Sequence, residues 1–199
     1  MMRKLVVLTF VSLDGVMQAP GGKGEDPSSS FQYEGWGFPA FDDTLGNEMG
    51  KQMGQPFDLL LGRKTYDIFA GYWPGQGADN PINKATKYVT TRRPVAADWK
   101  ETIPIQGDIV PEIRKLKQQD GPMLQVHGSS NLIQTLLAND LVDELWLKIF
   151  PLTLGKGKKL FGEGTIPAAF KLLGSYATPS GVIIANYKRE GEIKTGSFA

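Results

Sequence analysis

The architecture of the chain follows from one stretch, Leu59-Leu60-Leu61-Gly62-Arg63-Lys64-Thr65-Tyr66, in which an apolar run ends at a glycine and a basic, hydroxyl-bearing segment follows. Consecutive leucines are typical of a strand buried on both faces of a parallel sheet, and the residues after the glycine favour a helix. The free N–H groups at the start of that helix can bind an anion, and the side chains of Arg63, Lys64 and Thr65 can add hydrogen bonds. An ordinary glycine turn before a capped helix explains the same residues.

Two further segments have a similar character. An apolar run at residues 124–126 leads into His127-Gly128-Ser129-Ser130-Asn131, a small, hydroxyl-rich helix start. Another strand-like run ends in Thr90-Thr91-Arg92, whose hydroxyl groups and guanidinium suit the 2′-phosphate of an adenosine ribose. The repetition favours a binding track over ordinary helix capping. Neither the dinucleotide-binding pattern G-x-G-x-x-G nor the P-loop pattern is present in the sequence.

The other apolar runs alternate with helix-period stretches, which predicts an α/β fold around a mixed, mostly parallel sheet. Expected strands cover residues 4–11, 57–61, 87–91, 123–127, 144–151, 170–177 and 182–188, and expected helices cover residues 41–53, 63–70, 108–119 and 129–139. The last two strands should form an antiparallel hairpin, because only a turn-rich quartet separates them. We expect one domain over residues 1–190, a loose tail over 191–199, and two irregular, aromatic-containing segments at 17–38 and 71–81.

The composition excludes several function classes. With 22 Lys and Arg against 21 Asp and Glu, the net charge is +1, so neither nucleic acid nor a membrane surface is an expected partner. There is no cysteine, and His127 is the single histidine, so disulfides, thiolate nucleophiles and multi-histidine metal sites are excluded and no metal is expected. The short basic and apolar start fits a buried first strand better than a signal peptide, which makes a cytoplasmic protein the expectation.

Five motifs in order, SLDG at 12–15, GRKT at 62–65, HGS at 127–129, LVDEL at 141–145 and PLTLGKG at 151–157, carry a resemblance over nearly the whole chain. The chain resembles the dihydrofolate reductase fold, and more specifically the reductase domain at the C-terminus of the bifunctional riboflavin-biosynthesis deaminase-reductase and its stand-alone relatives. This resemblance implies a three-layer sandwich that binds NADPH. The Gly62 and Gly128 turns would flank its pyrophosphate, and the Thr90 turn would hold its adenosine phosphate.

The resemblance also implies an activity. The chain would be an NADPH-dependent reductase of a pyrimidine- or pteridine-type heterocycle, similar to 5-amino-6-(5-phosphoribosylamino)uracil reductase. Dihydrofolate reductase activity, a non-catalytic nucleotide sensor and an interaction protein are the alternatives. Because the deaminase of the bifunctional protein needs cysteine ligands for zinc, that activity is absent. Val16 stands where the pathway enzyme commonly has a basic residue, which weakens a ribosyl-phosphate substrate. The relatives are commonly dimers, and the apolar run 145–150 makes a homodimer the expectation.

Two carboxylates are candidates for a catalytic role. The resemblance places Asp14, directly after the first strand, near the nicotinamide and the reducible ring, and it places Asp43 at the start of the helix whose carboxylate binds the pteridine in dihydrofolate reductases. Asp14 can equally cap a turn, and Asp43 can simply complement a helix dipole. For His127, a structural role or a contact with the cofactor is favoured over catalysis.

Four aromatic residues are candidates for stacking on a planar heterocycle: Trp36 and Phe38 in the first irregular segment, and Tyr72 and Trp73 in the second. Covering the core is the competing role for each of them.

Overall fold

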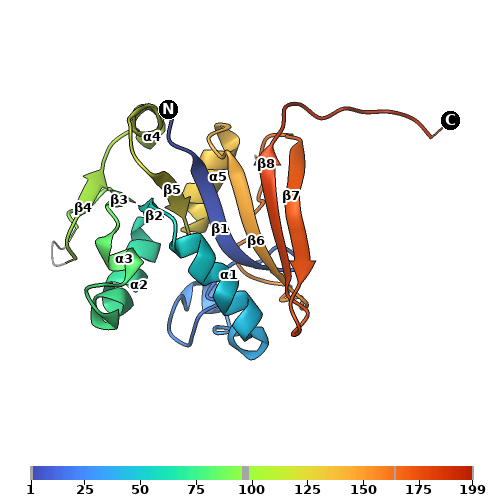
Figure 1. Ribbon diagram of the computed structural model, residues 1–199, viewed down its shortest axis with the longest axis horizontal. Coiled ribbons are helices and arrows are strands. Elements are labelled where there is room, and N and C mark those ends of the chain that lie inside the picture. The colour runs from blue at the N-terminus through green and yellow to red at the C-terminus, as the bar shows by residue number, and fades with distance from the viewer. Residues whose placement is uncertain (1, 96–98, 164, 199) are drawn as a thin grey trace.

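The computed structural model describes residues 2–95, 99–163 and 165–198, and its centre is an eight-stranded sheet in the order β4-β3-β2-β5-β1-β6-β8-β7 (Figure 1). The strands are β1 (Leu5–Ser12), β2 (Phe57–Gly62), β3 (Lys87–Thr90), β4 (Thr102–Ile105), β5 (Met123–Val126), β6 (Glu144–Phe150), β7 (Phe170–Ala177) and β8 (Ile183–Arg189). From β4 to β6 every neighbouring pair is parallel, whereas β8 is antiparallel to both β6 and β7. The mixed, mostly parallel sheet with a C-terminal hairpin is therefore confirmed.

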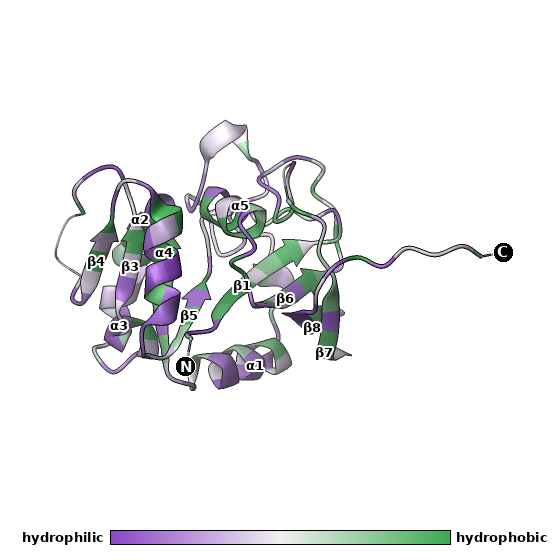
Figure 2. Cartoon of the chain, turned by 90° about the horizontal axis from the view of Figure 1, so that it is seen from above, coloured by the Kyte–Doolittle hydropathy of each residue, from purple (hydrophilic) through white to green (hydrophobic). Residues whose placement is uncertain are grey.

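Helices cover both faces of this sheet and make the fold a three-layer sandwich (Figure 2). One face carries α1 (Asp43–Met53), α2 (Arg63–Tyr72) and α3 (Pro81–Lys84), and the other carries α4 (Ile109–Gln118) and α5 (Ser130–Ala138). Short 3₁₀ turns, η1 (Ser28–Ser30), η2 (Phe38–Ala40) and η3 (Trp73–Gln76), lie within the segments between the longer elements.

The apolar runs of the sequence arise because the central strands are buried on both faces. In β1, Leu5 and Val7 pack into the cluster formed with α4 and α5, whereas Val6 and Leu8 pack on the opposite face with Trp146. Successive side chains of a strand point to opposite faces, so a strand between two helical layers needs apolar residues at every position.

An ion pair is buried at the end of the sheet where the central strands β1 and β2 begin. The guanidinium Nη2 of Arg3 bonds to the carboxylate of Asp58, and the two side chains are only 2% and 12% exposed. Arg3 Nε also donates to the carbonyl of Pro122 at 2.7 Å, and Asp58 accepts from the Thr86 amide at 3.1 Å. This pair joins the N-terminal residues to the start of β2 and to the segments that precede β3 and β5.

Two short elements differ from the sequence-based expectation. Strand β4 was not predicted, because it has four residues, lies at the edge of the sheet and contains Pro104, which has no N–H group for a ladder. The segment 71–81 is not wholly irregular, since α2 continues to Tyr72 and η3 and the start of α3 follow. The other predicted strands and helices are present, with ends that move by one or two residues.

The apolar run that suggested a dimer has a different role. Strand β6 lies between β1 and β8, and six of its seven residues, all but Ile149, are buried. The edges of the sheet are β4 and β7, and in β7 the side chains of Leu172, Leu173 and Tyr176 are exposed. The homodimer stays a prediction. In the described part of the chain, no helix combines the length and the apolar character needed to cross a bilayer.

Candidate functional site

Two adjoining hollows lie at the carboxyl ends of the parallel strands. The apolar pocket has a volume of about 220 Å³, and its lining includes Leu8, Phe10, Met17, Met49, Ile68 and Phe69. The polar pocket has a volume of about 700 Å³, and its lining includes Gly62, Arg63, Thr90, Thr91, Arg92 and Asn131. Lys64 and Ser129 line both, so the two hollows share a wall and together form one elongated site.

Three helices, α2, α4 and α5, begin at this site, and α2 and α5 differ from α4 in how they are capped. The side chains of Asp42, Asn80 and Asp108 accept hydrogen bonds from the first turns of α1, α3 and α4. Helices α2 and α5 begin after Gly62 and Ser129, and neither has a side-chain cap. The first N–H groups of a helix have no partner within it, so α2 and α5 offer their N–H groups and positive dipole ends to a ligand.

The starts of α2 and α5 are held together by a backbone contact that only glycine permits. The Gly62 amide donates to the carbonyl of Gly128 at 3.0 Å. A Cβ atom at Gly62 would lie 2.2 Å from Ser129 Oγ and 2.9 Å from its backbone nitrogen, and one at Gly128 would lie 2.6 Å from Thr65 Oγ1. The peptide between Gly128 and Ser129 is cis. Two uncapped helix starts are thereby brought side by side.

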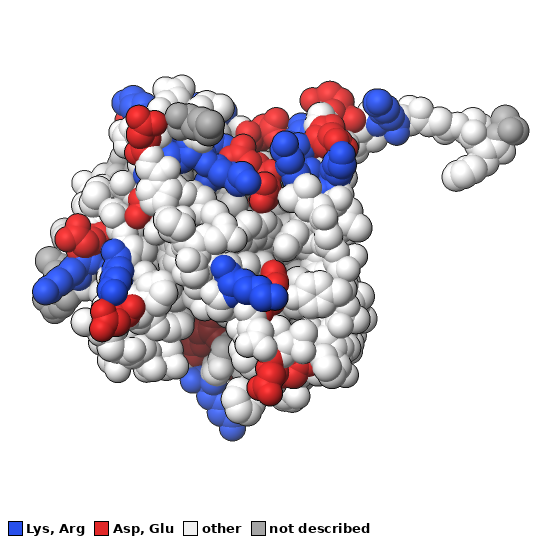
Figure 3. All heavy atoms as spheres, in the orientation of Figure 1, with Lys and Arg blue, Asp and Glu red and all other residues white. Residues whose placement is uncertain are grey.

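The cations of the polar pocket are not equally available. Arg63 is already engaged, because its Nε bonds to Asp67 at 2.8 Å and its Nη1 donates to the Pro94 carbonyl at 2.8 Å. Arg92 forms no ion pair or hydrogen bond with any residue that the structure describes. The guanidinium of Arg93, which also lines this pocket, has no partner among the described residues either, so Arg92 and Arg93 are the two groups there most free to bind a phosphate. On the face seen in Figure 3, basic and acidic side chains are interspersed, so attraction of an anion is local.

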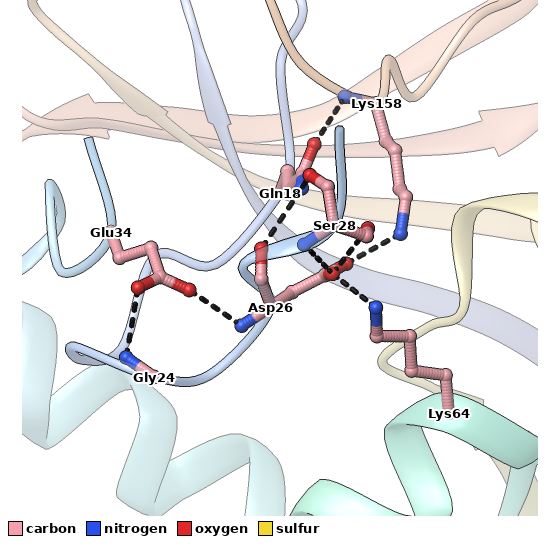
Figure 4. A network of polar contacts seen from close by, with 7 residues as sticks. All are labelled: Gln18, Gly24, Asp26, Ser28, Glu34, Lys64 and Lys158. Carbon is pink, nitrogen blue, oxygen red and sulfur yellow. Dashed lines mark hydrogen bonds and ion pairs between the residues drawn. The ribbon is translucent and has the colours of Figure 1, made fainter. Parts of the chain in front are cut away.

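A carboxylate from the first irregular segment connects the loop to the shared wall (Figure 4). The Asp26 side chain accepts from the ammonium groups of Lys64 and Lys158 and from the Ser28 hydroxyl. Gln18 supports this arrangement, since its amide donates to the Asp26 carbonyl at 3.0 Å and accepts from the Lys158 amide at 3.1 Å. Burial raises the pKa of Asp26, but the hydrogen bonds from Lys158, Lys64 and Ser28 outweigh this effect and lower the pKa to about 2. Asp26 is therefore ionised.

The remaining titratable groups of the apolar pocket have opposite tendencies. Burial raises the pKa of Glu25 above its ordinary value, and the neighbouring charges of Asp26 and Glu34 add to this, although the amides of Gly21 and Gly22 bond to its carboxylate. Burial lowers the pKa of His127 to about 3, so the imidazole is neutral. Glu25 is thus the acidic side chain of this pocket that most readily carries a proton.

The structure brings the residues expected to bind a cofactor together. Each of them lines one or both pockets: Gly62, Arg63, Lys64, Thr65, Thr90, Thr91, Arg92, His127, Gly128, Ser129, Ser130 and Asn131. That they bind NADPH stays a prediction.

The two expected catalytic carboxylates line neither pocket. Asp14 accepts from the Ser12 hydroxyl at 2.6 Å and from the amides of Leu154 and Gly155 at 3.1 and 2.7 Å. The Ser12 contact is the main cause that lowers the pKa of Asp14 to about 2. The geometry favours the turn-capping role for Asp14. Asp43 lies exposed in the first turn of α1, where a negative charge complements the dipole.

The four expected stacking residues also lie outside both pockets. Trp36 is a core residue, because its indole donates to the Gln18 carbonyl at 2.7 Å and its ring meets Phe150 edge to face at 5.2 Å. Phe38 and Tyr72 are exposed, and Trp73 packs against Phe69 and Tyr72. These positions give a substrate-binding role no support.

The side chains that do surround the apolar pocket include Met17, Glu25, Met49, Ile68, Phe69 and Lys158, none of which was expected. One sequence signal pointed to two of them. Ile68 and Phe69 follow Lys64 and Thr65 by four residues, and residues four apart lie on one face of a helix. Val16, by contrast, is fully buried beside Phe31 and pairs with Lys159 in an isolated bridge, so position 16 lines neither pocket. The basic side chains that line the apolar pocket are those of Lys64 and Lys158.

Comparison with protein families gives a match to the RibD C-terminal domain over residues 3–184. Among curated proteins, the uncharacterized protein YyaP of Bacillus subtilis is 28% identical over 200 residues, which cover 95% of this chain and 96% of YyaP. The uncharacterized protein YwjB of the same organism is 28% identical over 176 residues, which cover 88% and 92%.

Solved structures that share the fold include the following three. A putative riboflavin biosynthesis protein from Shewanella sp. PV-4 has a TM-score of 0.68 at 23% identity, with 94% of this chain and 99% of the other covered. A pyrimidine reductase-like protein from Corynebacterium diphtheriae has a TM-score of 0.61 at 13% identity, with 96% and 93% covered. Dihydrofolate reductase from Enterococcus faecalis, solved with NADP(H) and RAB-propyl, has a TM-score of 0.60 at 16% identity, with 94% and 96% covered.

Proposed function

Because the chain belongs to the RibD C-terminal domain family, we propose that it is an NADPH-dependent reductase of a pyrimidine- or pteridine-type heterocycle. NADPH, when bound, supplies a hydride, so the protein has to orient the two ligands, exclude water and provide a proton. The reductase domain of riboflavin biosynthesis and dihydrofolate reductase offer related precedents for such a reaction.

One observation carries this proposal: the elongated site is cationic and hydroxyl-rich at one end and apolar at the other. The polar pocket has the uncapped starts of α2 and α5, the Thr90 and Thr91 hydroxyls and the guanidinium of Arg92. The apolar pocket offers Met49, Phe69 and other apolar surface to a planar ring. A dinucleotide with phosphates in the middle and an uncharged ring beyond them has this same distribution of polarity.

Replacing Arg92 with Ala tests the cofactor. We expect the affinity for NADPH to fall by about 10- to 100-fold, because a charge-assisted hydrogen bond is worth roughly 1.5–3 kcal/mol, and the affinity for NADH to change little. Isothermal titration calorimetry with both dinucleotides at one fixed ionic strength measures the two affinities.

Arg114→Ala is the matched control, because Arg114 is exposed on α4, lines neither pocket and changes the net charge by the same amount. It should leave both affinities unchanged. An equal loss of NADPH and NADH affinity in Arg92→Ala would mean that Arg92 does not bind the 2′-phosphate. No binding of NADPH to the unaltered protein at micromolar concentrations would end the proposal as a whole.

Glu25 is the proposed proton donor, because its carboxyl group lines the apolar pocket and the pocket raises its pKa. A general acid acts in its protonated form, so the turnover rate should fall as the pH rises through this pKa. Glu25→Gln should lower kcat by about 100-fold and abolish that pH dependence, while NADPH binding is retained. Steady-state NADPH oxidation with the best substrate from a panel of pterins, dihydrofolate and aminouracils measures this.

Glu34→Gln is the control for Glu25. Glu34 belongs to the same loop and holds the amides of Gly24 and Asp26, at 2.8 and 2.9 Å, but it lines neither pocket (Figure 4). Its replacement should retain the pH dependence but move it to lower pH, because the Glu34 charge contributes to the raised pKa of Glu25. If the two variants behave alike, Glu25 acts by ordering the loop and is not the acid. A protein that binds NADPH but turns over no member of the panel would instead fit the alternative of a non-catalytic sensor.

A further inference from the structure

His127 is the only histidine of the chain, and it follows β5 directly, on the wall of the apolar pocket. Its ring lies 5.7 Å from the ring of Phe69, between centroids, so α2 packs against one side of it. The imidazole has two nitrogens, and the hydrogen bond that one of them makes decides what the other can offer to a ligand.

A chain of hydrogen bonds fixes the ring nitrogen that carries the proton. The Gln125 amide nitrogen Nε2 donates to the backbone carbonyl of Gln52 at 3.1 Å, and this contact orients the amide group, because a carbonyl oxygen only accepts. Gln125 Oε1 is then the atom that lies 3.3 Å from His127 Nε2. Since Oε1 also only accepts, Nε2 must be the protonated nitrogen of His127.

The charged groups around His127 keep the ring neutral. Lys148 of β6 is fully buried and donates to the side chain of Gln52 on α1, and Gln52 in turn donates to Glu48 at 2.9 Å. Burial is the main cause of the lowered pKa of His127, and the Lys148 charge adds to it. The carboxylates that line the same pocket belong to Glu25 and Asp26, and Asp26 is paired with Lys64 and Lys158. A second proton on the ring is therefore disfavoured.

The other ring nitrogen, Nδ1, is left without a partner. It forms no hydrogen bond with any described residue. Nor is it sealed inside the protein, since Asn186 Oδ1 is the only fully buried side-chain nitrogen or oxygen atom without a partner in the described part of the chain. Nδ1 of a neutral imidazole with a proton on Nε2 is a hydrogen-bond acceptor.

We infer that His127 is a specificity-determining residue that uses the Nδ1 lone pair to accept a hydrogen bond from an N–H group of the ligand in the apolar pocket. This inference rests on the proposed function for the identity of the ligands. Two of them carry such a donor: the carboxamide of the nicotinamide, and the ring N–H or amino group of a pterin or uracil. A ligand that offers only acceptors at this position should be discriminated against, because Nδ1 and its oxygen would repel each other.

The single histidine makes a direct test possible. In ¹⁵N-labelled protein without a histidine tag, long-range proton–nitrogen correlation spectra contain one set of imidazole signals. We expect the tautomer with the proton on Nε2, unchanged from pH 5 to 8. A titration within that range, or a proton on Nδ1, would overturn the inference. This measurement uses the protein without ligands, so its result does not depend on the proposed function.

The ligand is identified by adding NADP⁺ and pterin in separate titrations. A shift of the Nδ1 signal by NADP⁺ but not by its 3-acetylpyridine analogue, which lacks the carboxamide N–H, assigns the donor to the cofactor. A shift by pterin but not by an N-methylated pterin assigns it to the substrate. If calorimetry detects binding of both ligands and neither moves the Nδ1 signal, the inference is wrong. If neither ligand binds, the proposed function fails, and the assignment of an N–H ligand fails with it.

Two variants separate recognition from packing. His127→Asn keeps an acceptor near the position of Nδ1 and should retain the ligand affinity to within about threefold. His127→Phe keeps the ring beside Phe69 but removes the acceptor, and should lower the affinity by about tenfold, the equivalent of one hydrogen bond. Thermal unfolding confirms that both variants fold. If His127→Phe binds as well as the unaltered protein and His127→Asn binds worse, ring packing is the role of this position.

Discussion

Replacing Asp58 with Asn should lower the free energy of unfolding by about 3 kcal/mol, one of the two largest effects that we expect from a single substitution. The change leaves Arg3 buried with its charge unpaired, and removal of one partner of a buried pair typically costs about 3–5 kcal/mol. The lower end applies because an asparagine oxygen can still accept a hydrogen bond from the Thr86 amide. Urea unfolding should show a lower midpoint with an unchanged slope.

The surface pair of Asp79 and Lys84 provides the control for Asp58. Their side chains are 100% and 62% exposed, so Asp79→Asn should leave the urea midpoint unchanged. A double variant, Arg3→Met with Asp58→Leu, should recover much of the stability that Asp58→Asn loses, because no buried charge remains. If Asp58→Asn were as stable as the unaltered protein, the pair would have no part in joining the N-terminus to the sheet.

Replacing Gly62 with Ala should have the largest effect on ligand binding. The new Cβ would lie 2.9 Å from the backbone nitrogen of Ser129. A change of side-chain rotamer cannot relieve this contact, because the Cβ and the nitrogen are both fixed by the backbone. We expect a loss of about 1–3 kcal/mol in stability and a loss of more than tenfold in NADPH affinity, because the substitution separates the starts of α2 and α5. Thermal unfolding and calorimetry measure the two losses.

Gly50→Ala is the control for Gly62→Ala. Gly50 lies exposed in α1, and a Cβ atom there has no other atom within 4 Å, so this variant should be as stable or up to about 1 kcal/mol more stable. The double variant Gly62→Ala with Ser129→Ala identifies the contact that matters. Recovery of NADPH binding in the double variant would mean that the Ser129 hydroxyl, and not the backbone, is the obstacle.

The central strands could be predicted from the sequence because their burial requires apolar residues at consecutive positions. Strand β2 is buried at every residue, and apart from Asp58, which is paired with Arg3, this burial appears in the sequence as apolar residues. Strand β4 is not buried in this way, so its sequence has no comparable pattern. It is exposed at Ile103 and Pro104 and depends on pairing with β3 for its conformation. An edge strand of four residues is formed by its neighbour more than by its own composition.

The place of the glycine turns beside the pockets could be predicted for a similar reason, and the places of the aromatic side chains could not. A glycine followed directly by a helix start is a local sequence pattern that favours anion binding, so Gly62 and Gly128 can be recognised from their immediate neighbours in the sequence. Whether an aromatic ring faces a pocket depends on distant partners. Trp36 became a core residue through Gln18 and Phe150, the latter more than a hundred positions away, whereas Phe69 reached the pocket as an ordinary residue of a helix.

Lys64 belongs to the walls of both hollows while its ammonium group is bonded to Asp26. An anion that recruits Lys64 from the polar side must draw it away from that carboxylate, and the loop that carries Asp26 then loses one of its two ammonium anchors. Occupancy of one pocket would therefore change the free energy of binding in the other, and by thermodynamic necessity the influence is equal in both directions. A single flexible side chain can in this way make the binding of cofactor and substrate interdependent, without any movement of the sheet.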